Sequence, residues 1–391
     1  MILGAVLLSG LGVWGIAIGA VAGSFVQFVV QLPFIYSLGF RFIAKLEPTH
    51  PDFLKVVKLA IPRMVEMVVL QIAKGVELFL ATTISVASYT HLIFANTLQL
   101  LPVAFFGYSL GKATFPTLSH YAAQNKRGEF ATTLRFTLGQ IFFFVAPLAV
   151  ALVVLRIPLI RLVFGAQRFG WEATVQTGLT LSAFSVAVIT QAAVAILARS
   201  FYALHDTKTP MFISIVSLLV GIMLSFFFIL SLHIGVWGLA LSYSIISLLQ
   251  AGVLLLLLNR RVSFLHGEFV GNIVKIGVAA SIAGFVMYFL LKILDQAVWD
   301  KRLSFLGDFG LALPTTFQVF VLDTRYTINL VFLTLLVITV GAFVYLFVAT
   351  LLRCREIEVL ARWITTLAER RVSIPPAKGE SELPAPLPPG G

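Results

Sequence analysis

Four charged side chains interrupt one very apolar stretch, IPRMVEMVVLQIAKGVELFLATTI, at residues 61–84. They are Arg63, Glu66, Lys74 and Glu77, and the last three follow the first by 3, 11 and 14 residues. At about 100° per residue, this spacing places all four on one narrow face of a helix. Each carboxylate also follows a cation by three residues, the spacing at which helical side chains pair.

Ionisable groups inside so apolar a helix are costly unless they are paired or face water, and they usually mark a pathway or a binding site. We therefore expect the four charges to face an internal cavity. The alternative is that they form two neutralised pairs that only hold helices together. The next apolar run carries Asn96 and Gln99 on one helix face, either as polar ligands or as contacts between helices.

The composition of the chain argues against a soluble protein. Of its 391 residues, 59% are hydrophobic and only 12% are charged, and the mean hydropathy is +0.99. Soluble domains carry roughly a quarter charged residues, so we predict an integral membrane protein. The net charge of +11 is then attributed to basic residues at cytoplasmic helix ends, and not to nucleic acid binding.

Patterns typical of enzymes and metal sites are missing from the sequence. It contains no P-loop, no Gly-x-Ser-x-Gly elbow and no His-x-x-x-His pair, and its six histidines are scattered. The single cysteine, Cys354, excludes an internal disulfide and a Cys-rich metal site. We predict that the protein is not an enzyme, binds no metal and needs no cofactor. The one exception that we consider is a cation that drives transport. Transport would then be driven by an ion gradient or a membrane potential.

Nine stretches of the chain reach the length and hydrophobicity that a membrane-crossing helix needs. They are residues 12–37, 55–83, 91–118, 133–156, 175–203, 211–232, 236–258, 271–294 and 328–352. Residues 2–8 are apolar but too short to cross. Because lipid offers no partner for unpaired strand edges, we predict an all-α polytopic membrane helix bundle. It would have about nine full transmembrane helices plus a partial first one.

Basic residues divide unevenly between the two sides of this predicted bundle. Alternate connections hold 18 Lys and Arg residues on one side and 7 on the other. The positive-inside rule places the richer side in the cytoplasm. Its connections are residues 38–58, 119–135, 199–210, 259–275 and 353–378. The basic loop 156–168 and the longer connection 296–327 are then external, and the proline-rich tail 373–391 is predicted to be disordered and cytoplasmic.

One cytoplasmic connection, RSFYALHDTKTP at residues 199–210, is short and rich in polar groups between two apolar runs. It is predicted to be a tight turn. Asp206 or Thr207 would cap the next helix, and Pro210 would lie in the first turn of that helix.

A short motif occurs twice in the chain, as LGVWGIA at 11–17 and IGVWGLA at 234–240, with an offset of 223 residues. Gln27 and Gln250 fall at the same offset. Chance is the alternative, but six matched identities at one offset favour a true repeat. Each copy is predicted to open a span, since Gly-x-Trp-Gly suits a tight turn with a tryptophan at the membrane interface.

This repeat predicts units of six helices, the sixth of which opens with the motif. Residues 1–37 would then be the remnant of an N-terminal lobe and 38–260 a complete six-helix C-terminal lobe. Residues 261–352 would add two transmembrane helices, followed by a basic segment and tail at 353–391. Transporters are commonly built from such repeats, with the substrate held between them. We therefore expect an N-terminally truncated transporter.

Four segments together resemble one protein family. ARSFYALHDTKTP (198–210) is similar to its most distinctive cytoplasmic turn, and GVWGIAIGAVAGSFVQFVVQLP (12–33) to its sixth helix. FANTLQLLPVAFFGYSLGKATFPTLS (94–119) is similar to its eighth helix, and RLVFGAQRFGWEAT (161–174) to the loop before its tenth. The family is the bacterial lipid II flippases, called MurJ or MviN, in the superfamily of multidrug and oligosaccharidyl-lipid exporters. The resemblance runs from residue 1 to about residue 352.

The resemblance implies fourteen helices, arranged as two six-helix lobes and two further C-terminal helices. It implies that the protein moves lipid II, the undecaprenyl-linked peptidoglycan precursor, from the inner to the outer leaflet of the cytoplasmic membrane. This step serves peptidoglycan synthesis, cell wall biogenesis and cell shape. A cationic central cavity would take the pyrophosphate and sugars, and the last two helices would form a groove for the lipid tail.

The candidate site departs from the family pattern in two ways. The family's cavity cations lie partly on its first two helices, which precede the part that this chain resembles, and Thr97 stands where many members have arginine. A pyrophosphate needs cations in a cavity of low dielectric, so we predict that Arg63 and Lys74 bind it. Glu66 and Glu77 would pair with these cations or bind a coupling ion. The predicted substrate-binding residues are Arg63, Lys74, Glu66, Glu77, Asn96 and Gln99.

Arg199, Asp206, Lys208 and Pro210 match the family's turn and are predicted to be structural or gating residues. The predicted partners are lipid II or a related polyprenyl-pyrophosphate glycolipid and the membrane lipids, with no nucleic acid, and we predict a monomer. The alternatives are a flippase for another polyprenyl-linked oligosaccharide, a cation-coupled drug exporter of the same superfamily, and a membrane scaffold that transports nothing.

Overall fold

The computed structural model describes four stretches of the chain, residues 13–37, 51–165, 169–295 and 326–357. Within α3, side chains are described only in part up to residue 67. The short apolar piece predicted at 2–8 and the tail predicted at 373–391 lie outside the described residues, as does nearly all of the connection predicted at 296–327. The chain divides into two compact units, a first unit of residues 1–65 and a second unit of residues 66–391.

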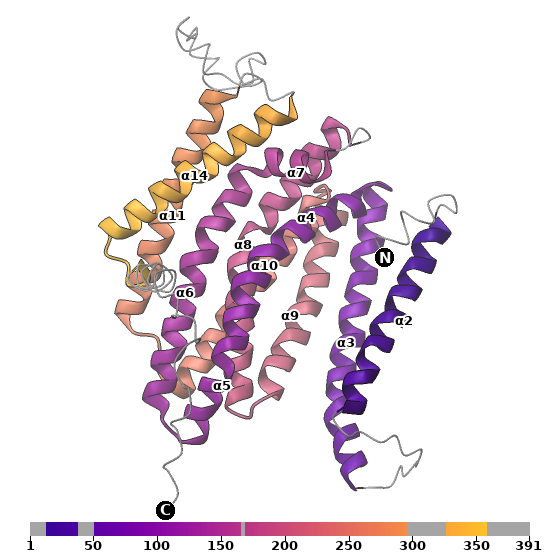
Figure 1. The fold of residues 1–391 in the computed structure, drawn as a ribbon, viewed down its shortest axis with the longest axis vertical. Coiled ribbons are helices and arrows are strands. Elements are labelled where there is room, and N and C mark those ends of the chain that lie inside the picture. Colours follow the sequence, from indigo (N-terminus) through magenta and orange to yellow (C-terminus); the bar gives the residue numbers. More distant parts are fainter. Residues whose placement is uncertain (1–12, 38–50, 166–168, 296–325, 358–391) are drawn as a thin grey trace, which may run out of the picture. The chain divides into compact units, whose positions relative to one another are not determined.

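The described elements are helical, as predicted (Figure 1). The α-helices are α2 (Val13–Ser37), α3 (Pro51–Ile84), α4 (Ser88–Pro102), α5 (Ser109–Ala123), α6 (Arg127–Val154), α7 (Arg156–Phe164), α8 (Trp171–Ala203), α9 (Lys208–Phe226), α10 (Trp237–Val262), α11 (Gly267–Leu294) and α14 (Thr327–Leu351). Two π-helical segments, η2 (Val103–Tyr108) and η3 (Phe227–Ser231), continue α4 and α9. The all-α prediction is therefore confirmed.

Eight helical stretches among the described residues are long and apolar enough to cross a membrane. They are Ala17–Ser37, Ser88–Ala123, Arg127–Val154, Trp171–Ala203, Lys208–Ser231, Trp237–Val262, Gly267–Leu294 and Thr327–Leu351. Each corresponds to one of the nine predicted spans. The remaining span, predicted at 55–83, is the 34-residue helix α3.

Both copies of the repeated motif stand where a helix begins. In the first unit α2 begins at Val13, within LGVWGIA, and in the second unit α10 begins at Trp237, within IGVWGLA. The two helices have nearly equal lengths, 25 and 26 residues. The prediction that each copy opens a span is therefore confirmed.

Helix α8 forms the centre of the second unit and packs against α4, α5, α6 and α10. Its buried side includes Ala187, Ala192 and Ala195, and such small residues let helix backbones approach closely. A Cβ added to Gly107 of η2 would lie 2.7 Å from the Cα of Ala192, so η2 and α8 are in direct backbone contact. The core therefore has little room for larger side chains at this crossing.

Hydroxyl groups connect α8 to α10, and α9 to α10, within the apolar bundle. Thr190 Oγ1 and Ser247 Oγ are 2.5 Å apart, and Ser244 Oγ donates to the carbonyl of Ala183 at 2.5 Å. A third bond of 2.6 Å joins the hydroxyls of Ser225 and Ser242. Such bonds help to hold neighbouring helices together in a membrane. Lipid tails are as apolar as the helix surfaces, so the hydrophobic effect contributes little to helix association there.

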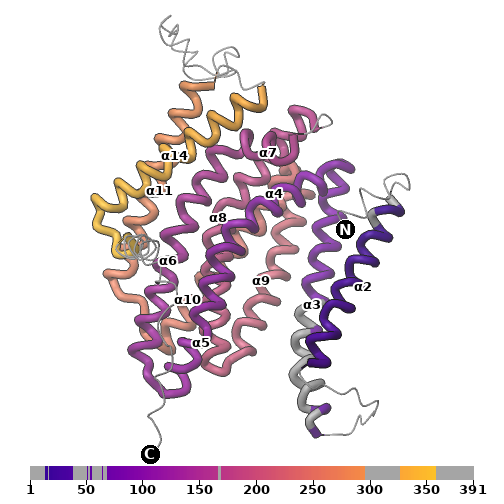
Figure 2. Tube along the Cα trace, in the orientation of Figure 1, coloured from indigo at the N-terminus to yellow at the C-terminus, as the bar shows by residue number. Residues whose placement is uncertain are grey.

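The last two described helices, α11 and α14, lie side by side and α11 packs on α6 (Figures 1 and 2). Tyr345 of α14 donates its hydroxyl hydrogen to the carbonyl of Phe143 in α6, at 2.7 Å. Just beyond α14, Glu356 is only 8% exposed and accepts two hydrogen bonds from the Asn272 Nδ2, at 2.7 and 2.9 Å. The bond from Tyr345 therefore fixes this pair of helices to α6, and the bonds between Asn272 and Glu356 join the two members of the pair.

The spans predicted at 91–118 and 211–232 correspond to Ser88–Ala123 and Lys208–Ser231, and the π-helical segments η2 and η3 lie within them. One predicted boundary needs correction. The loop predicted at 156–168 begins with α7, a nine-residue helix that packs against α8 and α14. Its sequence RIPLIRLVF is apolar between two arginines, and its buried residues Pro158 and Ile160 explain why it folds onto the bundle.

Candidate functional site

Two of the four predicted charges of α3, Lys74 and Glu77, have described side chains in the second unit. Ala81 is fully buried in the apolar core, and it follows Glu77 by four residues and Lys74 by seven, so all three share one side of the helix. Lys74 itself is exposed and Glu77 is half-buried. No ion pair joins them in the described part of α3, so the spacing that allows these two residues to pair does not produce a direct contact here.

The other two predicted charges, Arg63 and Glu66, also lie within α3. Their side chains fall outside the described part of that helix. Their predicted role therefore stays a prediction.

Asn96 and Gln99 interact directly, as their spacing predicts. The Gln99 Nε2 donates to the Asn96 Oδ1 at 2.8 Å, and Gln99 is fully buried between α4 and its neighbours. The second polar atom of the Gln99 amide, Oε1, is buried without a hydrogen-bond partner among the described residues. An acceptor of this kind can hold a donor such as water or a substrate hydroxyl. Thr97, between them, is exposed and bonds the carbonyl of Ile93 in its own helix.

Asp206 organises the turn between α8 and α9. Its Oδ1 accepts the backbone N–H of Thr209 at 3.0 Å, and its Oδ2 accepts the Thr209 hydroxyl at 2.6 Å. Of the two predicted caps, Asp206 makes these bonds, whereas Thr207 makes no side-chain capping bond. The same carboxylate forms an ion pair with Arg261, at the end of α10, with an N–O distance of 2.6 Å.

The remaining turn residues have separate surroundings. Arg199 donates to the carbonyl of Ala195 at 2.6 Å, and its guanidinium lies where a Cβ on Gly111 of α5 would be, 2.8 Å from Nη1. The Arg199 guanidinium is also 6.0 Å from the ring centre of Tyr108. Lys208 is exposed at the start of α9, and Pro210 is buried two residues later. Arg199 therefore contacts the η2–α5 segment, whereas Asp206 contacts α10.

The sequence model of the family described as "Lipid II flippase MurJ" matches residues 1–307, well over half of the chain. The chain belongs to this family. A curated relative from Vibrio cholerae serotype O1, named "Probable lipid II flippase MurJ", is 28% identical over 240 residues, covering 61% of this chain and 45% of the relative. The relative of the same name from Thermotoga maritima is 24% identical over 346 residues, covering 88% of this chain and 62% of its own length.

A solved structure named "Lipid II flippase MurJ, inward closed conformation" has the same fold. It superposes with a TM-score of 0.67 at 23% identity, and the match covers 92% of this chain and 65% of that one. This MurJ-family chain thus spans about half to two thirds of the length of the proteins it matches. Family and fold together make it a multi-pass membrane protein of a transporter family, and not an enzyme.

Sequence reasoning missed two residues that complete the MurJ-like turn. Arg261 was counted only as a cytoplasmic charge, although it is the partner of Asp206. Gly111 carried no signal of its own, since its small size matters only because Arg199 lies over it. A third contact, between His91 Nδ1 and the Thr177 hydroxyl at 3.1 Å, joins α4 to α8 in the buried interior. Such partners lie far apart in the sequence, and a single sequence carries no signal that two distant residues are in contact.

Removal of the Asp206 charge should weaken the turn in a pH-dependent manner. Burial raises the pKa of Asp206. The hydrogen bonds from Thr209 and the nearby Arg261 together lower this pKa by more than burial raises it, so it lies below the ordinary value of 3.8. A carboxylate with a lowered pKa stabilises the fold above its unfolded pKa, and this contribution is lost as the pH falls through the folded pKa. We expect Asp206→Asn to cost about 1 kcal/mol near neutral pH, because Arg261 is partly exposed.

Thermal unfolding of wild type and Asp206→Asn between pH 7 and pH 3 measures this effect. The difference between them should be constant above about pH 5 and shrink below about pH 4. Thr207→Ala is the matched control and should change little, since that side chain makes no capping bond. A difference that is the same at pH 3 and pH 7 would show that the charge of Asp206 is not what stabilises the turn.

Proposed function

We propose that this chain takes part in moving lipid II, an undecaprenyl-linked peptidoglycan precursor, from the inner to the outer leaflet of the cytoplasmic membrane. The observation that carries the proposal is the match of residues 1–307 to the lipid II flippase MurJ family. The shared fold with a solved MurJ structure supports it. Lipid II or a closely related polyprenyl-pyrophosphate glycolipid is the proposed substrate.

The proposed mechanism uses the charged face of α3. Residues 38–260 would form one lobe, and residues 1–37 would belong to a second. Lys74 shares a side of α3 with the buried Ala81, and in the proposed mechanism its charge would bind the pyrophosphate of the head. Arg63 would add a second cation, and Glu66 and Glu77 would balance the charge when no substrate is bound.

The paired helices α11 and α14 are the proposed site of the lipid tail. Both are long and apolar enough to cross the membrane, and each exposes large apolar side chains, including Phe285 on α11 and Phe343 on α14. The prenyl tail would remain against such surfaces in the membrane while the polar head crosses through the cavity. The charged groups of α3 would then contact the polar head and not the apolar tail.

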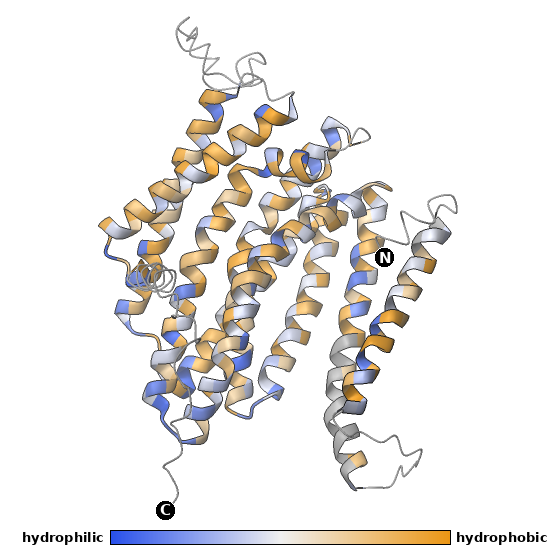
Figure 3. Cartoon of the chain, in the orientation of Figure 1, coloured by the Kyte–Doolittle hydropathy of each residue, from blue (hydrophilic) through white to orange (hydrophobic). Residues whose placement is uncertain are grey.

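The end of the second unit that contains the turn at 199–210 is proposed to face the cytoplasm. Three of its connections, which the sequence assigned to one side, meet there through the Arg261–Asp206 ion pair and the Arg135–His266 hydrogen bond of 3.2 Å. Figure 3 shows hydrophilic residues gathered at this end of α5 and α6. The tail after residue 357 would then also be cytoplasmic.

Transfer of fluorescent lipid II in reconstituted vesicles tests the function. Because the chain covers 45% of the Vibrio cholerae relative, it is tested alone and together with the part of that relative that it does not cover. Accelerated transfer of lipid II over protein-free vesicles in either form would support the proposal. No acceleration in both forms would contradict it, above all if the same vesicles carried drugs or another polyprenyl-linked oligosaccharide.

Lys74→Gln should slow lipid II transfer about tenfold, because a charge-assisted contact to the pyrophosphate contributes on the order of 1.5–3 kcal/mol. Lys126→Gln is the matched control. Lys126 is exposed just before α6, outside α3, α11 and α14, and its loss should leave the rate unchanged. Equal rates for Lys74→Gln and wild type would remove Lys74 from the site.

A further inference from the structure

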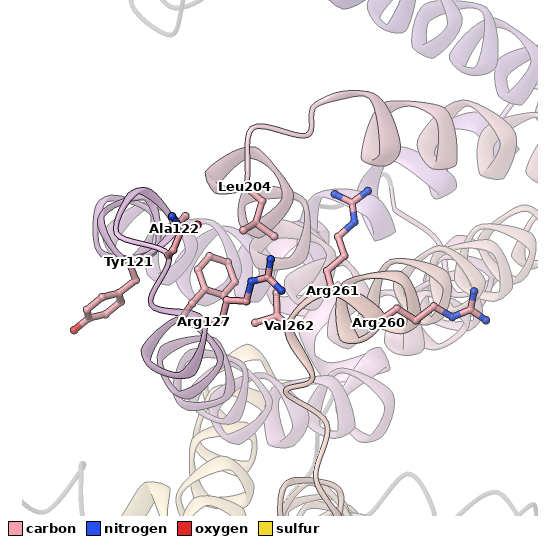
Figure 4. A pocket seen from close by; sticks show the side chains of 9 residues that line it. Tyr121, Ala122, Arg127, Leu204, Arg260, Arg261 and Val262 are labelled. Carbon is pink, nitrogen blue, oxygen red and sulfur yellow. The ribbon is translucent and has the colours of Figure 1, made fainter.

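A pocket of about 390 Å³ opens at the end of the second unit where α5, α6, α8 and α10 have their connections (Figure 4). The residues that line it are Tyr121, Ala122, Asn125, Arg127, Phe130, Leu204, Arg260, Arg261 and Val262. The residues that line it are distant in the sequence from the charged face of α3. The path proposed above for lipid II does not include this pocket. Three of the lining residues are arginines, and none is a carboxylate.

Arg127 is the cation that the pocket leaves available. Figure 4 shows its side chain reaching toward Leu204 and Val262, whereas Arg260 extends away from them. Arg127 forms no ion pair within the described part of the chain. The pocket therefore presents at least one guanidinium that no carboxylate among the described residues neutralises.

Arg261 gives the pocket a second and better fixed positive group. The Asp206 carboxylate holds it at 2.6 Å, and its guanidinium also lies 5.4 Å from the ring centre of Phe201. Arg127, Arg260 and Arg261 outnumber two nearby carboxylates among the described residues, Asp206 and the exposed Glu129, so the charge around the pocket is net positive. A planar guanidinium that is held in place binds phosphate oxygens in a bidentate manner.

The amino end of α6 adds to this positive field. The helix begins at Arg127, and its first-turn N–H groups receive no side-chain capping bond, although the Arg127 N–H donates to the carbonyl of Asn125 at 3.0 Å and the exposed Glu129 lies in the same turn. These groups carry part of the helix dipole's positive charge and favour an anion nearby. Asn125 and Arg127, on either side of this helix start, both line the pocket.

The floor of the pocket is apolar. Phe130 is 1% exposed and Val262 is 8% exposed, and Leu204 lies beside them. A basic rim above an apolar floor, at the ends of membrane-crossing helices, is the arrangement that takes the head of an anionic lipid together with the start of its acyl chains. Inorganic phosphate would use the same cations but not the floor.

We propose that this pocket binds a phosphate-bearing anion, through Arg127 and Arg261, at the same end of the protein as the turn at 199–210. The chemical class is a phosphate monoester or diester, such as the head group of phosphatidylglycerol. The proposal does not depend on lipid II transfer, because the pocket and the charged face of α3 share no residue. It gives the distinctive turn a task, which is to hold Arg261 through Asp206.

Native mass spectrometry of the full chain, released from vesicles of phosphatidylcholine and phosphatidylglycerol, tests the proposal. We expect retained phosphatidylglycerol in preference to phosphatidylcholine, and about fivefold weaker retention in Arg127→Gln. Arg355→Gln is the matched control, because Arg355 is a 76% exposed arginine at the same end, paired with Glu268 outside the pocket. It should retain the lipid as wild type does.

Competition by inorganic phosphate and by glycerol 3-phosphate separates the two sources of the phosphate group. Displacement of the lipid only at high concentrations indicates a lipid site, and tight binding of the soluble compounds indicates a soluble ligand, and both results support a phosphate site. Equal retention by Arg127→Gln, Arg355→Gln and wild type would overturn the proposal. Equal retention of phosphatidylcholine would overturn it as well, whatever the outcome of lipid II transfer.

Discussion

Gly107→Leu is expected to lower the free energy of unfolding by about 3 kcal/mol, the upper end of the usual cost of overpacking a core. An added Cβ would lie 2.7 Å from the Cα and 3.0 Å from the Cβ of Ala192, and 3.3 Å from its carbonyl oxygen. These are backbone atoms or atoms fixed to the backbone, so no change of rotamer relieves the clash. Helix α8 and η2 would have to separate at the centre of the second unit.

Thermal unfolding in detergent, followed by near-ultraviolet circular dichroism, measures this loss. Gly252→Ala is the matched control, since Gly252 is also inside a membrane helix but an added Cβ meets nothing within 4 Å. It should leave the midpoint unchanged or raise it, because alanine favours the helix by up to about 1 kcal/mol over glycine. A midpoint for Gly107→Leu within error of the control would show that η2 and α8 are not in close contact.

Glu356→Ala is expected to loosen the end of α14 and to cost about 2–3 kcal/mol of local stability, the range of hydrogen bonds to a charged group. The Glu356 carboxylate accepts both bonds from Asn272 and is in close contact with Gly139, so its loss leaves an unpaired amide and a gap between α6, α11 and α14. Cys354, two residues earlier, is buried and is the single cysteine of the chain. It therefore reports on this contact.

The rate of Cys354 alkylation is the measurement. Burial and the nearby Glu356 raise the pKa of the Cys354 thiol, with Lys275 acting in the opposite direction, so the wild-type thiol should react slowly with maleimide at pH 7. Glu356→Ala removes the carboxylate and exposes the thiol, and both changes should speed the reaction more than tenfold. Glu268→Gln is the control, because that carboxylate is 78% exposed in its pair with Arg355 and contributes little.

An alkylation rate in Glu356→Ala equal to that of the control would contradict a docked α14. If alkylation is fast already in the wild type, the segment after α14 is not held as the structure places it. Slow alkylation in the wild type with fast alkylation in the variant would support the polar anchor. Lipid II transfer by the same variant would then tell whether the helix pair must stay docked for function.

The sequence alone determined the helical spans, the uneven distribution of charge and the family. Length and hydropathy identify a membrane helix without knowledge of its neighbours, because a bilayer of fixed thickness selects for them. The turn at 199–210 was predicted for a similar reason, since Asp206 caps a helix that begins two residues later. Local pairing was less certain, as Lys74 and Glu77 show, because a spacing permits an ion pair but does not require it.

Only the tertiary structure decided which faces of these helices meet. The spans are apolar on nearly every side, so the hydrophobic pattern does not say how a helix is rotated about its axis. The partner of Asp206, the space that Gly111 leaves for Arg199 and the anchor at Glu356 all depend on that rotation. The pocket beside Arg127 depends on it too, because its walls come from four helices that meet only after the chain has folded.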